Sequence, residues 1–293
     1  MIMKDAAEVF DAYEAIRSRL PSMPSPGAGQ DIDALTDIAE TVDAFVFDAF
    51  GVLNVGDTPI PGAARRVAAL RSMGKAVRVL SNAASYDRVA AFAKFTRLGI
   101  PLAEEELVTS RDATLLAMDA RLWGVIAAPE DRLLDMPGPT LRLGDDRDAI
   151  DRAEGIVFLS SAGWTEARQQ MLTDSLAARP RPVLIGNADL VAPRETGLSL
   201  EPGHFAQTLP APDLRMFGKP FPDVYTLTRA SLPGTPPSRI AMCGDTLHTD
   251  ILGAAAERWQ TVLVTRDGLF AGHDTRPFET RSGIVPDWRV ARI

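Results

Sequence analysis

The chain has 293 residues, of which 46% are hydrophobic and 24% charged, proportions typical of a folded globular protein and unlike those of a disordered one. It contains 31 lysines and arginines against 39 aspartates and glutamates, a formal charge of −8 without any basic run, so we expect no nucleic-acid partner. The single cysteine, Cys243, excludes an internal disulfide framework and a cysteine-cluster zinc site, which fits a reducing compartment.

The first forty residues predict a helical extension ahead of the main fold. Residues 1–20 have the pattern of an amphipathic helix, residues 21–30 form a Pro/Gly/Ser-rich linker, and residues 31–40 predict a second short helix. Acidic side chains stand where a signal peptide needs an apolar stretch, and no segment reaches the roughly eighteen apolar residues of a membrane span. The sequence therefore predicts a cytoplasmic protein that has no membrane partner.

Short apolar runs alternate with helical patterns along the rest of the chain. Strands are predicted at 44–50 and 75–83, each followed by a helix, and at 239–245 and 261–268, on either side of a helix at 247–259. Such alternation is typical of a parallel sheet with helices on both faces. We therefore predict an α/β fold with a Rossmann-like, doubly wound core.

The length of the chain favours two domains, and its middle region has enough predicted strands and helices to form one of them. The last twenty residues carry little pattern, and we expect them to wrap the surface or to join an oligomer contact. The expected boundaries are an N-terminal helical extension at 1–40, a core at 41–86 and 213–293, and an inserted α/β domain at 87–212.

Polar residues end several of the predicted core strands, where ligand sites of open α/β sheets lie. Taken singly, each has an ordinary explanation as a helix cap, a turn residue or a solvated side chain. Four such segments in one chain are more specific than any one of them. Their residues are Asp48 after AFVF, Ser81 and Asn82 after VRVL, Lys219 in FGKPFPDVY, and Asp245 after IAMCG with Asp250 a few residues on.

The order of these segments resembles the four motifs of the haloacid dehalogenase-like (HAD) hydrolase superfamily. DAFGVL (48–53) stands in the place of the first motif, normally Asp-x-Asp-Gly. GKP (218–220) and GDTLHTD (244–250) are nearly the forms found in the class IIA branch, which includes sugar-phosphate, pyridoxal-phosphate and nitrophenyl-phosphate phosphatases. Asp48 and Ser81 are only 33 positions apart, whereas 138 positions separate Ser81 from Lys219, so a cap domain must follow the second motif, as in class IIA. GNADLVAP (186–193) resembles the family's Asn-Pro-Asp segment of the cap.

The resemblance implies a Mg²⁺-dependent phosphatase acting on a small phosphorylated metabolite. Asp48 would attack phosphorus and form an aspartyl-phosphate, which divides one difficult step into two easier ones. Relatives of this class often dimerise through their caps, so a homodimer is one expectation. The implied metal site comprises Asp48, Asp245, the main-chain carbonyl of Phe50, and Asp250 in an orienting role, and the implied phosphate site comprises Gly51, Ser81, Asn82 and Lys219.

Phe50 departs from the phosphatase pattern. The residue two positions after the nucleophile is usually an aspartate that protonates the leaving oxygen and later activates water, a contribution of about 10² to 10⁴ in rate. Two alternatives follow. Dehalogenases of the superfamily also replace this aspartate, but they use no metal and carry their cap elsewhere. A protein that binds a phosphometabolite without turnover would also retain these motifs.

The three histidines show no pattern typical of a catalytic base. His204 and His273 stand apart from any serine or cysteine motif. His248 is the exception, because it lies inside the fourth motif and could face the mouth of the site.

Overall fold

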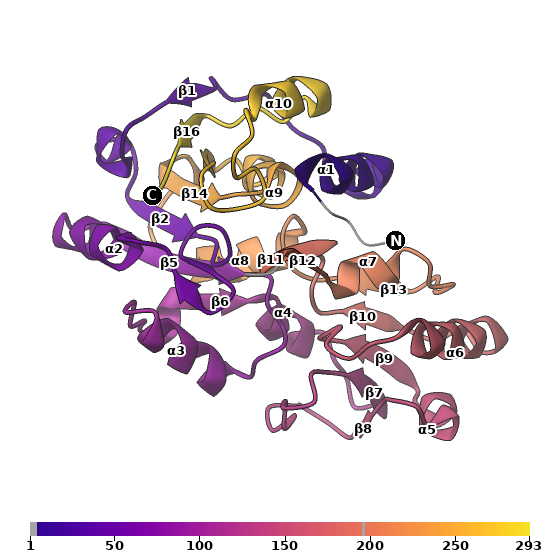
Figure 1. Ribbon diagram of the computed structural model, residues 1–293. Helices are drawn as coiled ribbons and strands as arrows, with labels where there is room; N and C mark the ends of the chain where they lie inside the picture. The colour runs from indigo at the N-terminus through magenta and orange to yellow at the C-terminus, as the bar shows by residue number, and fades with distance from the viewer. Residues whose placement is uncertain (1–4, 195–196) are drawn as a thin grey trace.

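The computed structural model describes residues 5–194 and 197–293, and it contains two α/β units with separate sheets (Figure 1). The larger sheet has seven strands, and every neighbouring pair is parallel. The predicted parallel core is confirmed. In sheet order the strands are β1 (Gln30–Asp31), β16 (Trp288–Val290), β15 (Gln260–Val264), β14 (Ile240–Gly244), β2 (Ala44–Phe47), β5 (Ala76–Ser81) and β6 (Leu107–Thr109).

Strand β2 shows why the central runs are apolar at every position. Phe45 and Phe47 pack into the hydrophobic cluster on one face of the sheet, and Ala44 and Val46 pack into the cluster on the other. Because helices cover both faces, a central strand has no side exposed to water. The first face is covered by α2 (Ala63–Ser72) and α3 (Arg88–Arg97), and the second by α4 (Ser110–Leu116), α8 (Pro222–Ala230) and α9 (Leu252–Ala256).

The second unit, which we call the cap, is built on five parallel strands and lies below the core in Figure 1. Its strands in sheet order are β13 (Leu214–Met216), β10 (Val183–Ile185), β9 (Gly155–Phe158), β7 (Trp123–Ile126) and β8 (Thr140–Arg142). Its helices are α5 (Arg147–Arg152), α6 (Glu166–Ala178) and α7 (Pro202–Ala206), and a hairpin of β11 (Val191–Arg194) and β12 (Gly197–Leu200) projects towards the core.

The boundaries of the cap differ from those expected at 87 and 212. Strand β6 pairs with β5 and extends the core sheet, whereas β13 pairs with β10 in the cap. Measured by its sheet, the cap therefore runs from Trp123 to Met216. The difference has a local cause: β6 and β13 have three residues each, too few to show a period of two.

The N-terminal extension is only partly helical. Residues 1–4 lie outside the described residues, α1 spans Ala6–Ala15, and 3₁₀ turns follow at Arg17–Arg19 and Leu35–Ile38. Gln30–Asp31 instead forms the edge strand β1 beside β16, a pairing that local patterns cannot reveal. None of the described helices is long and apolar enough to cross a lipid bilayer.

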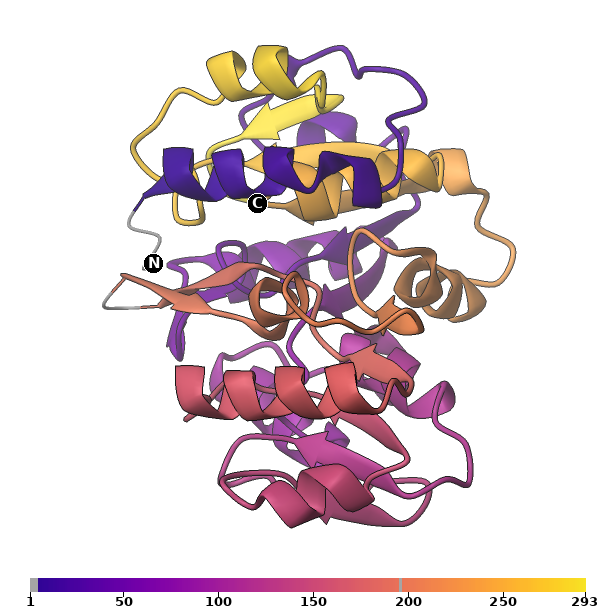
Figure 2. The same ribbon diagram turned by 90° about the vertical axis from the view of Figure 1, so that its right-hand side faces the viewer.

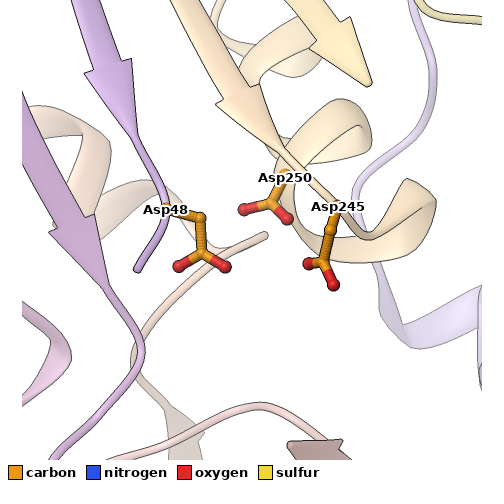
Figure 3. Close-up of side chains that lie close together, drawn as sticks. All are labelled: Asp48, Asp245 and Asp250. Carbon is orange, nitrogen blue, oxygen red and sulfur yellow. The ribbon is translucent and has the colours of Figure 1, made fainter. Parts of the chain in front are cut away.

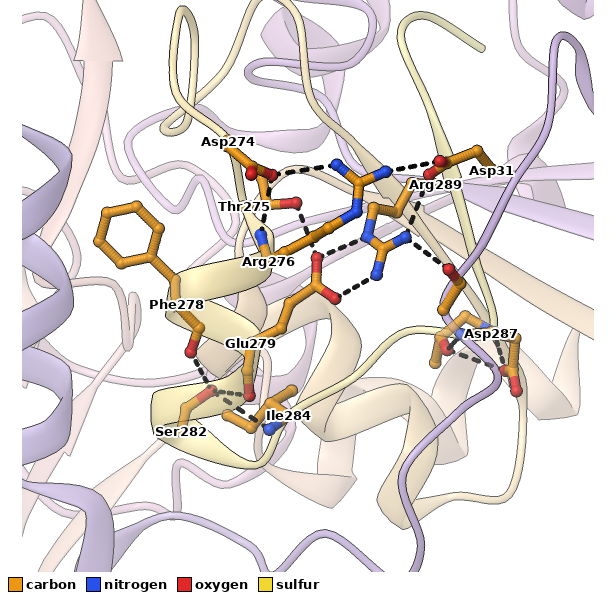
Figure 4. Close-up of polar contacts among 12 residues, drawn as sticks. Asp31, Asp274, Thr275, Arg276, Phe278, Glu279, Ser282, Ile284, Asp287 and Arg289 are labelled. Carbon is orange, nitrogen blue, oxygen red and sulfur yellow. Dashed lines mark hydrogen bonds and ion pairs between the residues drawn. The ribbon is translucent and has the colours of Figure 1, made fainter.

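The C-terminal residues enter the sheet rather than wrapping the surface, because β16 lies between β15 and β1. Figure 4 shows the polar contacts that hold this edge. Arg289 of β16 donates to both carboxylate oxygens of Glu279, at 2.7 and 2.6 Å, and lies 3.0 Å from Asp31 of β1. Glu279 belongs to α10 (Arg276–Ser282), so one guanidinium joins a helix and two strands.

Two short antiparallel strands complete the core. β3 (Asn54–Val55) and β4 (Thr58–Pro59) form a small hairpin directly after β2. Further 3₁₀ turns lie at Glu104–Glu106 and Pro237–Arg239.

Candidate active site

Three buried carboxylates meet at the carboxyl edge of the core sheet (Figure 3). Asp48 follows β2 and Asp245 follows β14, and these two strands are neighbours. Asp250 comes from a π-helical turn, Leu247–Ile251, that joins β14 to α9. An oxygen from each carboxylate lies within 4.8 Å of the others. The structure therefore brings together the predicted nucleophile and the two later aspartates.

Two glycines make room for this cluster. A Cβ at Gly244 would lie 2.1 Å from Cγ of Asp250, and one at Gly51 would lie 2.3 Å from Oδ2 of Asp245. Gly51 also has φ of +80°, which side chains rarely adopt. Its N–H donates to the carbonyl of Asn54 at 2.8 Å, and its contact with phosphate stays a prediction.

Lys219 contacts two of the three carboxylates, those of Asp48 and Asp250. Its Nζ is 2.6 Å from Oδ1 of Asp48 and 2.7 Å from Oδ1 of Asp250, and the side chain is buried. Burial alone would lower the pKa of Lys219, but the charges of Asp250 and Asp48 outweigh it and raise the pKa above its ordinary value. The ammonium therefore stays charged beside the predicted nucleophile.

The carboxylates themselves are held far from their ordinary acidity. Burial and the charge of Asp250, offset in part by Lys219, raise the pKa of Asp48 to about 6. Burial and the charges of Asp250 and Asp48 raise the pKa of Asp245 to about 8. One lysine thus does not balance three carboxylates. Oxygen donors converging with excess negative charge fit a hard divalent cation such as Mg²⁺.

The two polar residues after β5 have different surroundings. The amide of Asn82 donates to Oδ1 of Asp189 at 2.8 Å and to the carbonyl of Lys219 at 2.9 Å, and its oxygen accepts from the N–H of Lys219 at 2.7 Å. Both amide hydrogens of Asn82 are therefore used in contacts with Asp189 and Lys219, and its contact with phosphate stays a prediction. The hydroxyl of Ser81 accepts from the N–H of Ala83 at 3.2 Å, and Ser81 lines the cavity.

A cavity of about 950 Å³ lies over these residues, between the core and the cap. The predicted cap segment reaches it through Asn187 and Asp189, and the hairpin reaches it through Arg194. Asp189 is tied to the core by Asn82, so the cap and the core are linked beside the nucleophile. His248 does not line the cavity; it is buried against α1, 2.6 Å from Oε1 of Glu14.

One corner of the cavity is aromatic where a phosphatase would place its acid. Phe50 lines the cavity, with Nζ of Lys94 at 4.0 Å and the guanidinium carbon of Arg194 at 5.2 Å from its ring centroid. Lys94 is only 6% exposed, and burial lowers its pKa to about 8. The charges of Asp57 and Asp48 act in the opposite direction but do not outweigh burial.

Several residues of this site gave no signal in the sequence. Lys94 stands on α3, Arg194 on the cap hairpin, and Tyr13 and Val9 on α1, yet the first two contact the Phe50 ring and the last two line the cavity. None of them belongs to a motif. Only the tertiary packing of three separate segments brings them to one place.

Known proteins resemble this chain in both units. The family described as haloacid dehalogenase-like hydrolase matches residues 45–131, and the family described as HAD-hydrolase-like matches residues 216–288. Human glycerol-3-phosphate phosphatase is 28% identical over 291 residues, which covers 86% of this chain and 89% of that protein.

Solved structures share the fold of the whole chain. A possible sugar phosphatase of the HAD superfamily from Cytophaga hutchinsonii superposes with a TM-score of 0.75 at 22% identity, over 90% of this chain and 98% of the other. A glycerol phosphate phosphatase from Mycobacterium tuberculosis, in complex with calcium, gives a TM-score of 0.62 at 21% identity, over 85% of this chain and 78% of the other.

Proposed function

The chain belongs to the haloacid dehalogenase-like hydrolases, in their class IIA branch, and is a phosphatase-like hydrolase; on that premise we propose that it hydrolyses a small phosphate monoester through Asp48. The observation that carries this proposal is the position of the Lys219 ammonium, 2.6 Å from Asp48 and 2.7 Å from Asp250 on the floor of a cavity. A phosphate dianion repels a carboxylate nucleophile unless nearby cations offset its charge.

A divalent ion and the Lys219 ammonium would together supply this positive charge. Asp48, Asp245 and the carbonyl of Phe50 would hold Mg²⁺, with Asp250 beside them, and the ion would supply positive charge towards the phosphate oxygens. Lys219 adds a fixed ammonium, and the free hydroxyl hydrogen of Ser81 can donate to a phosphate oxygen. The calcium in the mycobacterial structure supports a divalent ion in this fold.

The reaction would follow from the ionised Asp48. A bond forms between its carboxylate oxygen and phosphorus as the bond from phosphorus to the leaving oxygen breaks, and the electron pair stays on that oxygen. Water then attacks the phosphorus of the aspartyl-phosphate, which releases inorganic phosphate and restores the carboxylate.

Phe50 governs which substrates react well. Its ring cannot transfer a proton, so an alkoxide would have to leave without one, at a cost of about 10² to 10⁴ in rate. Arg194, which contacts the same ring and lines the cavity, favours a leaving group that departs as an anion. We therefore propose substrates whose leaving oxygen is already acidic, such as aryl or acyl phosphates, with sugar and polyol phosphates turning over slowly.

The retained acidic cluster disfavours a dehalogenase, which needs no cation beside its nucleophile. The missing acid keeps one second candidate open: a protein that binds a phosphometabolite and does not release phosphate.

Phosphate release from a graded set of esters tests the proposal. Acetyl phosphate, 4-nitrophenyl phosphate, phenyl phosphate and glycerol 3-phosphate would be compared with Mg²⁺ and with a chelator. We expect rates that fall steeply as the leaving group becomes less acidic, and no release by Asp48→Asn.

Each outcome separates the candidates. Release that persists in Asp48→Asn would overturn the role of Asp48, and equal rates across the set would overturn the role of Phe50. Ligand binding by the wild type without any release would support the binding protein instead.

A further inference from the structure

The N-terminal helix α1 lies across the junction of core and cap. In Figure 2 this indigo helix runs in front of the core, directly above the hairpin β11–β12. One side of α1 packs on the core, where Phe10 joins a cluster with Leu247 and Ile251 of the π-helical turn. The other side, through Val9 and Tyr13, packs on Leu190 and Val191 of the cap.

Polar contacts fix the helix in this position. Asp5 caps its first turn by accepting the N–H groups of Ala7 and Glu8 at 3.0 Å. Glu14 contacts Nε2 of His248 at 2.6 Å, and Asp11 forms an ion pair with Arg281 at 2.6 Å, both on the core. Just after the helix, Arg19 donates to Gln207 of the cap at 2.7 Å. The orientation of α1 is therefore set by both units.

Tyr13 is the residue of α1 that bears most directly on the cavity. Its ring stacks on His248 with centroids 5.1 Å apart, and its hydroxyl accepts the N–H of Leu190 at 3.1 Å. That N–H is the one partner of the hydroxyl within the described residues, so the hydroxyl hydrogen has no acceptor there. Tyr13 is 2% exposed and lines the cavity.

The chemistry of this phenol suits a donor. Burial and the charge of Asp189 raise the pKa of Tyr13 well above its ordinary value, so the hydroxyl keeps its hydrogen. A buried donor without an acceptor is costly, and a ligand oxygen that accepts the hydrogen bond removes that cost.

We propose that α1 is a third component of the substrate site and that Tyr13 is a specificity-determining residue, whose hydroxyl donates to an oxygen on the non-reacting part of the substrate. The ligand class is a phosphate ester that carries a hydroxyl or carbonyl oxygen beyond its phosphate. Val9 and the Tyr13 ring form an apolar wall beside that oxygen. The inference rests on the proposed function for the kind of ligand, but its test needs no turnover.

Calorimetric binding in the Asp48→Asn protein provides the test, because that variant does not consume the ligand. Glycerol 3-phosphate and inorganic phosphate would be titrated into it with Mg²⁺, with and without the further change Tyr13→Phe. Phenylalanine keeps the ring and its stacking on His248 and removes only the hydroxyl. We expect Kd for glycerol 3-phosphate to rise about 3- to 10-fold and Kd for phosphate to stay unchanged.

The control is Asp11→Asn, which breaks the exposed ion pair with Arg281 on the outer side of α1 and should change neither Kd. Equal weakening of both ligands by Tyr13→Phe would show a merely structural role and overturn the proposal. An unchanged affinity for glycerol 3-phosphate would do the same. Failure of the proposed function would appear separately, as absent phosphate release in the otherwise unaltered chain.

Discussion

Two buried lysines lie near the predicted nucleophile, and their pKa values are shifted in opposite directions. Lys219 contacts Asp48 and Asp250, whose charges raise its pKa, whereas Lys94 lies on the Phe50 ring, where burial lowers its pKa to about 8. Burial disfavours the charge of both residues, so the difference comes from how strongly carboxylates oppose it. Asp48 and Asp250 are in ion-pair contact with Lys219, whereas the charges of Asp57 and Asp48 do not outweigh the burial of Lys94.

This contrast divides the cavity into two functional corners. In the corner of Lys219, the ammonium lies beside Asp48 within the cluster of three carboxylates. In the other corner Phe50 and Arg194 line the cavity, and Lys94 contacts the Phe50 ring without lining the cavity. On the proposed function, the chain would bind and attack a phosphate at the Lys219 corner and would lack the usual acid at position 50.

Replacing Phe50 by an acid should have the largest effect on phosphate release. In Phe50→Asp we expect release from glycerol 3-phosphate to rise about 10²- to 10⁴-fold, because the new acid can protonate the alkoxide. Release from 4-nitrophenyl phosphate should change little, since its leaving group needs no proton. Steady-state rates on both esters measure this. Phe50→Asn, which cannot supply a proton, is the matched control, and an equal gain in that variant would contradict the explanation.

Removing each lysine in turn tests the comparison directly. Lys219→Met should lower phosphate release about 10²- to 10³-fold, because a fixed cation beside the transferred phosphate is lost. It should also destabilise the protein by about 3 to 5 kcal/mol, because buried carboxylates lose their partner. Lys94→Met should stay within about 1 kcal/mol of the unaltered protein. Denaturant unfolding and ester assays would show both; similar losses of stability in the two variants would refute the contrast.

Mg²⁺ and pH should both change the stability that depends on the carboxylates beside Lys219. The pKa values of Asp48, about 6, and Asp245, about 8, exceed the value near 4 of an unfolded carboxyl, so the folded metal-free protein binds more protons than the unfolded one. This contribution therefore makes stability fall as pH rises from about 4 towards 8. A cation offsets the repulsion between the ionised groups.

We accordingly expect the stabilisation by Mg²⁺ to grow across that range, reaching about 5 to 10 °C in Tm at a hundredfold excess over Kd. Thermal unfolding at pH 5 and pH 8, with Mg²⁺ and with a chelator, measures it. Asp245→Asn should flatten the dependence. An effect of Mg²⁺ that is the same at both pH values would argue against the three-carboxylate site.

The smallest effect should come from the pair after β5. Asn82→Ala removes the acceptor of the Lys219 N–H and should cost about 1 to 3 kcal/mol of stability. Ser81→Ala, with no such buried partner, should leave stability nearly unchanged and weaken phosphate binding instead. Unfolding and phosphate titration of both variants separate the two roles, and a destabilised Ser81→Ala would show that they were misassigned.

The elements that the sequence predicted well are those whose pattern is local. The strand ending at Asp48 is apolar at every position because it is buried on both faces, and that signature is visible without any partner. By contrast, β6 and β16 are three residues long, and β1 only two, so each becomes a strand through its neighbour alone. The same shortness of β6 and β13 hid which sheet each of them joins.

The sequence by itself determined the α/β architecture, the order of the motif residues and the absence of an acid at position 50. Each follows from residue types and short spacings, which are properties of neighbouring positions along the chain. Only the tertiary structure decided that Lys94 lies on the Phe50 ring and that Tyr13 reaches the cavity from the N-terminal helix. Contacts between segments so far apart are set by how the helices, the hairpin and the two sheets pack, and no local pattern records that packing.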